Sequence, residues 1–274
     1  MFAATARTHT EGLSNDERER FEAWGWLGPF PLLTSEGVDA LSEAFTATGE
    51  RFSWKNLRAS CEQNDFDTHP WFKSLHAYLP AFGEVACQPA IVERIASLLG
   101  PNLMAWGVSV TTRHPGQVHR WHVDVEHLKW PGISAFIGLK NASSNSSLTV
   151  IPGSHHFSST PQALGAHSNS EVLVAGRTYD PNCHLETIDI NDGEFFIFHG
   201  RLWHGSHNIG RKTRTAVIAQ YSTPQAEVAI PMGWDEPITW HSYRPPCLLV
   251  KGTDTSDINR TLNRATTQTP GIKP

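Results

Sequence analysis

The stretch HRWHVDVEH, residues 119–127, decides how the rest of the chain is interpreted. Side chains two residues apart in a β-strand point to the same face of the sheet, so His122 and Asp124 place an imidazole beside a carboxylate. These groups are two ligands for a divalent metal ion, which needs at least a third. An H-x-D pair occurs by chance in many chains, so the third ligand has to be found elsewhere in the sequence.

A second motif, FFIFHGRLWHGS at residues 195–206, adds further histidines. It predicts an apolar strand, then a turn, then His204. Two histidines and one carboxylate on one face, with the opposite coordination positions open, form the facial triad of non-haem Fe(II) oxygenases. His122, Asp124 and His204 are therefore candidate metal ligands and catalytic residues. His199 is the alternative to His204, but it precedes Gly200 in the predicted turn.

An arginine follows ten residues after His204. Arg214 precedes the alternating stretch TAVIA, residues 215–219, which predicts a strand. A guanidinium on the inward face of this strand is suited to bidentate capture of a carboxylate. Arg211 competes for this role and ranks second, because it lies in the turn before the strand.

The apolar pattern around these motifs has a period of two, which is typical of β-strands. Short strands bounded by turn-forming residues are predicted over residues 103–112, 133–139, 148–151, 195–198 and 213–221. Many short strands within one stretch favour a sandwich or jelly roll over alternating β-α units. The sequence therefore predicts a mainly β fold.

The first hundred residues are typical of helices instead. Ser14, followed by Glu17 three residues later, forms a capping box that predicts a helix start. The sequence GPFP at residues 28–31 predicts a rigid turn, and further helices are predicted to open at Thr34 and to cover residues 89–99. The last fifty residues are rich in proline and show no clear pattern.

Composition excludes several classes of protein. The chain has 274 residues, with 22 Lys and Arg against 27 Asp and Glu, and no block of basic residues, which disfavours a nucleic-acid partner. No run approaches the 18 apolar residues of a membrane span. The four cysteines, at positions 61, 87, 183 and 247, form no C-x-x-C motif and are typical of free thiols in a reducing cytosol. We expect a cytoplasmic protein, because the N-terminus also lacks an export signal.

These motifs together resemble the phytanoyl-CoA-dioxygenase-like (PhyH) family of Fe(II)- and 2-oxoglutarate-dependent oxygenases. The resemblance covers nearly the whole chain, and LTVIPGSH at residues 148–155 is similar to a characteristic stretch of the family. The other matching segments are LSNDE (13–17), FEAWGWL (21–27), HVD (122–124), DGE (192–194), HGR (199–201), HGS (204–206) and Arg214. Ser146-Ser147 departs from the Asn-Gly that relatives often have before the Leu of the long motif.

The resemblance implies a double-stranded β-helix, a cupin-like jelly roll, with a helical N-terminal scaffold. We expect one domain over residues 1–274, with a mostly helical scaffold at 13–100, the β-helix core at about 103–222 and a C-terminal extension at 223–274. His122, Asp124 and His204 would bind Fe(II), and Arg214 would pair with the far carboxylate of 2-oxoglutarate. O2 would be the second cosubstrate.

The activity implied by the resemblance is hydroxylation, or desaturation, of an unactivated C–H bond in a small-molecule substrate, with release of succinate and CO2. Halogenating relatives have Gly or Ala at the position of Asp124, so the carboxylate indicates oxygenation. Two alternatives stay open: a cofactor-independent cupin-type metalloenzyme, and a non-catalytic jelly-roll protein that binds a small ligand. The sequence predicts neither the substrate nor the oligomeric state, and no nucleic-acid or membrane partner is expected.

Overall fold

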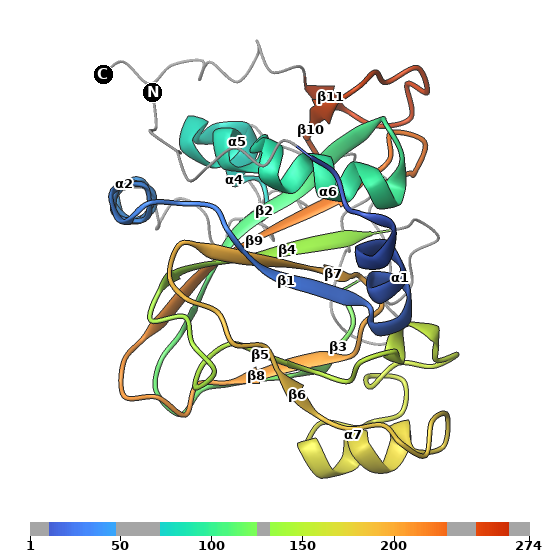
Figure 1. Ribbon diagram of the computed structural model, residues 1–274. Helices are drawn as coiled ribbons and strands as arrows, with labels where there is room; N and C mark the ends of the chain where they lie inside the picture. Colours follow the sequence, from blue (N-terminus) through green and yellow to red (C-terminus); the bar gives the residue numbers. More distant parts are fainter. Residues whose placement is uncertain (1–10, 48–71, 125–131, 229–244, 263–274) are drawn as a thin grey trace, which may run out of the picture.

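The computed structural model describes residues 11–47, 72–124, 132–228 and 245–262, in which two β-sheets face each other (Figure 1). The larger sheet has the strand order β1-β7-β4-β9-β2-β10-β11, and the smaller sheet has the order β3-β8-β5-β6. The strands are β1 (Trp26–Pro31), β2 (Leu103–Arg113), β3 (Val118–His122), β4 (Ile133–Lys140), β5 (Leu148–Val150), β6 (Glu186–Thr187), β7 (Glu194–His199), β8 (His204–His207), β9 (Arg214–Ser222), β10 (Cys247–Lys251) and β11 (Thr261–Leu262). The predicted jelly roll is confirmed.

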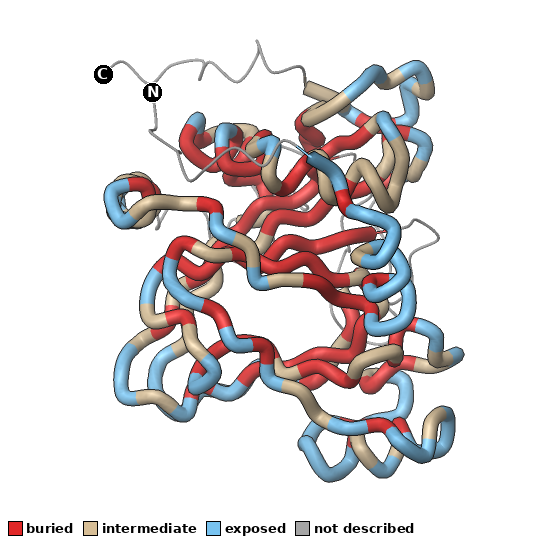
Figure 2. Tube along the Cα trace, viewed as in Figure 1, coloured by how far each residue is buried: buried red, intermediate tan, exposed pale blue. Residues whose placement is uncertain are grey.

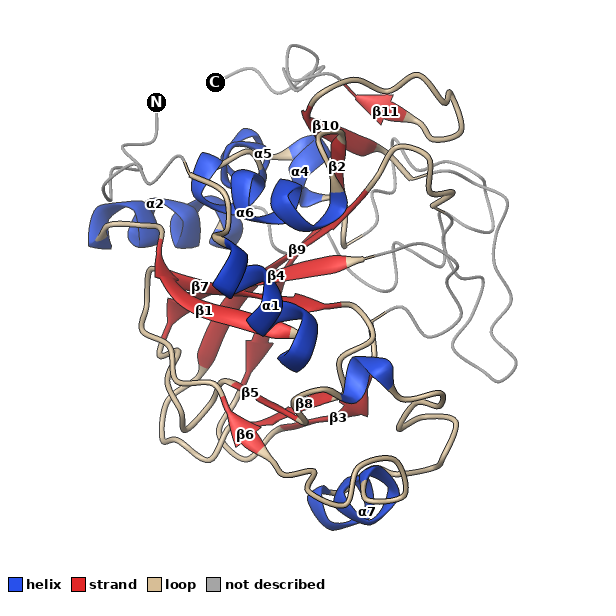
Figure 3. Cartoon of the chain, turned by 45° about the vertical axis from the view of Figure 1, so that its right-hand side comes forward, coloured by secondary structure: helices blue, strands red, loops and turns tan. Residues whose placement is uncertain are grey.

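Helices cover the face of the larger sheet that points away from the smaller one (Figures 1 and 3). They are α1 (Asn15–Trp24), α2 (Ser35–Thr46), α4 (Leu75–Tyr78), α5 (Pro80–Ala86) and α6 (Pro89–Leu99), while α7 (Asn169–Gly176) lies beside the smaller sheet. The predicted capping box of Ser14 and Glu17 is present at the start of α1, and Thr34 caps α2. Among the described residues, none of these helices has the length and apolar character that crossing a membrane requires.

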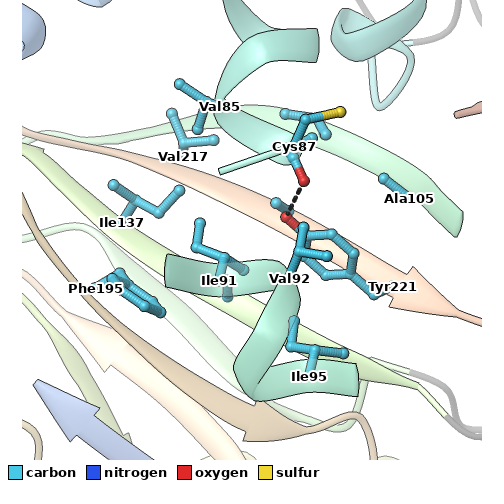
Figure 4. Close-up of a cluster of buried hydrophobic side chains, with 14 of the residues drawn as sticks. Val85, Cys87, Ile91, Val92, Ile95, Ala105, Ile137, Phe195, Val217 and Tyr221 are labelled. Atoms are coloured by element: carbon cyan, nitrogen blue, oxygen red, sulfur yellow. Dashed lines mark hydrogen bonds between the residues drawn. The ribbon is translucent and has the colours of Figure 1, made fainter. Parts of the chain in front are cut away.

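Alternation along the strands builds two apolar layers. On β9, Val217 and Tyr221 face the helices and pack against Ile91 and Val85 (Figure 4). The hydroxyl of Tyr221 donates a hydrogen bond of 3.1 Å to the carbonyl of Ala86, so this buried polar group has a partner. The helices are thereby fixed on the outer face of the sheet.

A second apolar cluster fills the space between the two sheets. Phe136, Phe196 and Phe198 come from the larger sheet and meet Leu148 and Val150 of the smaller one. The phenyl rings of Phe136 and Phe196 stack with centroids 5.1 Å apart. Figure 2 shows that the strands of both sheets are largely buried along this interior. The interior is a packed core, and the polar side chains described below lie beside it.

The turn predicted at residues 28–31 is wrong, because these residues belong to β1. This strand lies at the edge of the larger sheet and, among the described strands, pairs only with β7. Proline has no backbone N–H to donate, and an edge strand tolerates Pro29 and Pro31 because no described strand pairs with its outer side. The register shifts between Leu27 and Phe30, which accommodates Pro29 without breaking the pairing.

The sequence pattern also missed elements that depend on partners elsewhere in the chain. The last fifty residues contain β10 and β11, which extend the larger sheet next to β2. Helix α7 was not predicted, although Ser168 and Glu171 form a capping box at its start. That pair was the signal that sequence reasoning overlooked.

His76 provides a test of how the C-terminal strands are docked. Its side chain is fully buried, and its Nε2 donates a hydrogen bond of 2.9 Å to the carbonyl of Pro246, just before β10. Burial lowers the pKa of His76 from 6.5 to about 4, so the folded protein holds a neutral ring at pH values where the unfolded chain is protonated. Its contribution to stability is therefore present above pH 6.5 and is lost as the pH falls toward 4.

We expect protonation of His76 to decrease the free energy of unfolding by about 3 kcal/mol as the pH falls from 6.5 to about 4. Urea unfolding at pH 7 and at pH 4.5 measures the decrease, and comparison with His76→Gln isolates the contribution of His76 from those of other histidines. Equal pH dependence in the two proteins would contradict this prediction.

Candidate metal centre

The smaller sheet brings the predicted ligands together. His122 is the last residue of β3, and it lies directly opposite His204, the first residue of β8. Asp124 lies beyond the strand end, where its backbone N–H donates to the carbonyl of Gly200 at 2.8 Å. The prediction that one strand carries both His122 and Asp124 therefore holds only for His122. One potential ligand atom from each of the three side chains lies within 4.8 Å of the other two.

Backbone carbonyls fix the tautomer of both imidazoles. Nδ1 of His122 lies 2.8 Å from the carbonyl oxygen of Arg120, and Nδ1 of His204 lies 2.9 Å from that of Leu202. A carbonyl can only accept, so each Nδ1 carries a proton and Nε2 is the ring nitrogen that faces the other ligand atoms. Both Nε2 atoms lie 3.5 Å from Oδ1 of Asp124. Histidines that bind a metal commonly donate one ring N–H to a backbone carbonyl in this way, so that the other ring nitrogen is held toward the ion.

Asp124 is a charged carboxylate in a mostly enclosed place. Burial alone would raise its pKa, but interactions with the side chains of His122 and His204 hold the pKa well below its usual range. Its other oxygen, Oδ2, accepts hydrogen bonds from Ser134 Oγ at 2.7 Å and from Gln220 Nε2 at 3.0 Å. Two imidazole nitrogens and one anionic carboxylate oxygen therefore converge, which fits a divalent iron ion.

The structure does not bring His199 into this group. His199 lies at the end of β7, where its Nδ1 accepts the backbone N–H of Arg201 at 3.1 Å. Its ring centroid lies 5.1 Å from that of His155. Nε2 of His155 and Nε2 of His156 both donate to the carbonyl of Glu22, at 2.9 and 2.8 Å. These neighbouring histidines tie the end of α1 to the jelly roll and leave the metal centre to His204.

The second predicted group, Arg214, is buried beside the triad. Its Nη2 donates to Ser206 Oγ at 3.3 Å, and Ser206 is two residues beyond His204 on β8. Its Nε is buried without a hydrogen-bond partner, and the guanidinium carbon lies 5.3 Å from the ring centroid of Phe136. Burial and the nearby Arg113 lower the pKa of Arg214 to about 10. The competing Arg211 is exposed in the turn before β9.

Arg113 is a residue that sequence reasoning missed. It lies directly opposite Arg214 in the pairing of β2 with β9, and its Nε is also buried without a hydrogen-bond partner. Across the described ranges, no carboxylate lies within ion-pair distance of either guanidinium. A buried guanidinium beside a second, half-buried one is costly without an anion, so this place is suited to an acidic ligand. No local pattern revealed Arg113, since its relevance comes from its cross-strand partner.

Comparison with known proteins agrees with this geometry. The family model of phytanoyl-CoA dioxygenase (PhyH) matches residues 21–216, which include the triad and Arg214. The chain belongs to this family. Membership makes the chain an Fe(II)- and 2-oxoglutarate-dependent oxygenase that acts on a small molecule, and the predicted family and enzyme class are confirmed. A search among curated proteins finds no match.

Solved structures share the fold of this PhyH-family chain at low sequence identity. CytC3 with Fe(II) and alpha-ketoglutarate is 19% identical, with a TM-score of 0.61 over 92% of this chain and 93% of that one. EctD from S. alaskensis with 2-oxoglutarate and 5-hydroxyectoine is 18% identical, with a TM-score of 0.62 over 96% and 91% of the two chains. The carbocyclase SnoK from nogalamycin biosynthesis is 16% identical, with a TM-score of 0.58 over 81% and 89%.

Proposed function

We propose that His122, Asp124 and His204 hold the iron ion and that the enzyme hydroxylates, or desaturates, a C–H bond of its small-molecule substrate. When bound, Fe(II) supplies the O2-dependent oxidation that is coupled to conversion of 2-oxoglutarate into succinate and CO2. The protein contributes three ligands on one side of the ion and leaves the other positions to the cosubstrates. The converging donor atoms, with both Nδ1 protons on carbonyls, support this assignment.

The buried Arg214, which has no acidic partner among the described residues, is the observation that carries the proposal. Ser206 and Arg214 lie next to the triad, since Ser206 is about 7 Å along β8 from His204. A short dicarboxylate can therefore lie between the metal site and the guanidinium. We propose that Arg214 and Ser206 hold the distal carboxylate of 2-oxoglutarate and that Arg113 adds a second positive charge.

This feature separates the proposal from the two alternatives. A metalloenzyme that works without a cosubstrate has no use for a buried and a half-buried guanidinium group that meet no carboxylate among the described residues. A non-catalytic binding protein has no need of two imidazoles whose Nε2 atoms both converge on one carboxylate oxygen. The apolar cluster that includes Phe136 and Phe198 would keep water from the same region.

Cosubstrate turnover tests the proposal directly. We expect the purified protein with Fe(II), O2 and 2-oxoglutarate to form succinate, and a library of small-molecule substrates to raise that rate above the uncoupled background. Mass spectrometry then identifies the oxidised compound. Absence of succinate from protein that holds one equivalent of Fe(II) would disprove the use of 2-oxoglutarate.

We predict that the product carries a new oxygen atom or double bond and no halogen. Asp124 occupies the coordination position that a halide would need, and its Oδ2 is held by Ser134 and Gln220. Turnover in high chloride or bromide, followed by mass spectrometry, checks this expectation. A halogen isotope pattern on the product would mean that Asp124 leaves the metal during the reaction.

We also propose that residues 1–274 form one oxygenase domain and that the protein works in the cytoplasm. The contribution of β10 and β11 to the larger sheet supports inclusion of the 223–274 extension in that domain. Cys183 and Cys247 are free and buried, as is typical of a reducing compartment. Cys87 is also buried, and Cys61 lies outside the described residues.

A further inference from the structure

Gln220 connects the carboxylate ligand to a lysine from a distant part of the chain. Its side chain is buried on β9, with Nε2 3.0 Å from Oδ2 of Asp124 and Oε1 2.9 Å from Nζ of Lys73. Lys73 lies just before α4, where its backbone carbonyl accepts the N–H of Val108 from β2 at 2.7 Å. The lysine is therefore anchored to the larger sheet before its side chain reaches Gln220.

The chemistry of these partners allows one orientation of the Gln220 amide. An ammonium group only donates hydrogen bonds, and a carboxylate only accepts them. The amide oxygen must therefore face Lys73, and the amide nitrogen must face Asp124. Rotation of the amide by 180° would place two acceptors, and two donors, against each other. Lys73 thus holds the Gln220 donor toward Asp124.

The two oxygens of Asp124 consequently have different surroundings. Oδ2 accepts from Gln220 and Ser134, whereas Oδ1 lies 3.5 Å from Nε2 of both His122 and His204. A carboxylate held in this way offers one oxygen to a metal ion and keeps the other engaged with the protein. Denticity matters here, because a second bound oxygen would take a position that the cosubstrates need.

We propose that Lys73 and Gln220 form a positioning pair, in which Lys73 orients the amide of Gln220 so that Asp124 binds the metal through Oδ1 alone. This inference rests on the proposed iron site and adds two residues to it. Neither residue touches the metal position, and Lys73 acts through Gln220. Groups that orient a metal ligand commonly change metal affinity or activity by about 10–100-fold when removed.

Titration of the metal-free protein with Co(II) alone tests the pair without relying on turnover. We expect Gln220→Met to raise the Co(II) dissociation constant about 10–100-fold, because Asp124 loses a donor that fixes its orientation. Gln88→Met is a matched control, since among the described residues the Gln88 amide bonds only to the carbonyl of Glu84. This control should bind Co(II) like the wild type.

Lys73→Met separates positioning from simple electrostatics. Removal of a nearby positive charge would by itself tighten the binding of a cation, because the repulsion decreases. A positioning role predicts the opposite, a dissociation constant that rises about tenfold. Lys73→Arg, which keeps a donor for Oε1 of Gln220, should restore the affinity to near the wild-type value. In the Gln220→Met background, Lys73→Met should no longer weaken Co(II) binding.

The outcomes distinguish this inference from the proposed function. Failure of the wild type to bind Co(II), or full binding by His204→Ala, would overturn the metal site itself. Normal binding by the wild type together with unchanged or tighter binding by Lys73→Met would overturn the positioning pair alone. Lys73 is only partly buried, so this variant provides the test even if Gln220→Met does not fold.

Discussion

Replacement of His204 by alanine is expected to abolish stoichiometric Fe(II) binding. His204 is almost completely buried, with 4% of its side chain exposed, and its Nε2 lies 3.5 Å from Oδ1 of Asp124. Its removal leaves one imidazole and one carboxylate, which is too few protein ligands to retain the ion. Loss of a group that only orients a ligand costs about 10–100-fold, so loss of the ligand itself should cost more than that.

Iron titration of the purified variants checks this prediction, and two neighbouring histidines serve as controls. His207→Ala removes an exposed side chain from the same strand, and His199→Ala removes the alternative ligand at the end of β7. Both variants should keep one equivalent of Fe(II). Full iron occupancy in His204→Ala, with loss in His199→Ala, would move the ligand to His199.

The elements that could be predicted from the sequence are those with local signals. The capping box at Ser14 and the apolar alternation of β9 placed one helix and one strand correctly. The order of His122, Asp124 and His204 predicted a triad because two of these residues share one short motif. Local pattern was therefore sufficient to predict the three side chains that the structure brings together.

Features that depend on pairing between distant segments could not be predicted in this way. Pro29 looked like a turn residue, but its strand needs hydrogen bonds on one side only. The groups that surround Asp124 come from positions 73, 134 and 220, which no periodicity connects. Arg113 acquires its significance only when β2 is placed against β9. The fold brings the supporting residues together, while the candidate ligands are recognisable in the sequence itself.

Replacement of Arg214 by alanine should weaken 2-oxoglutarate far more than it weakens iron. A charge-assisted hydrogen-bonded pair contributes about 1.5–3 kcal/mol, so the dissociation constant for 2-oxoglutarate should rise about 10–100-fold or more. Iron should be little affected, because Arg214 contacts Ser206 and Phe136 and none of the three ligands. Titrations with 2-oxoglutarate and with Fe(II) separate the two effects.

Comparison with the other arginines shows whether burial decides the role. Arg211→Ala removes an exposed guanidinium three residues away and should leave the dissociation constant for 2-oxoglutarate unchanged. Arg113→Ala should weaken 2-oxoglutarate less than Arg214→Ala does, because it removes one positive charge and also relieves the repulsion on Arg214. If Arg214→Ala left the dissociation constant for 2-oxoglutarate unchanged and Arg211→Ala raised it, the cosubstrate would bind at Arg211, in the turn before β9. Arg214 and Arg113 would then need a different anion, and the substrate itself would be the first candidate.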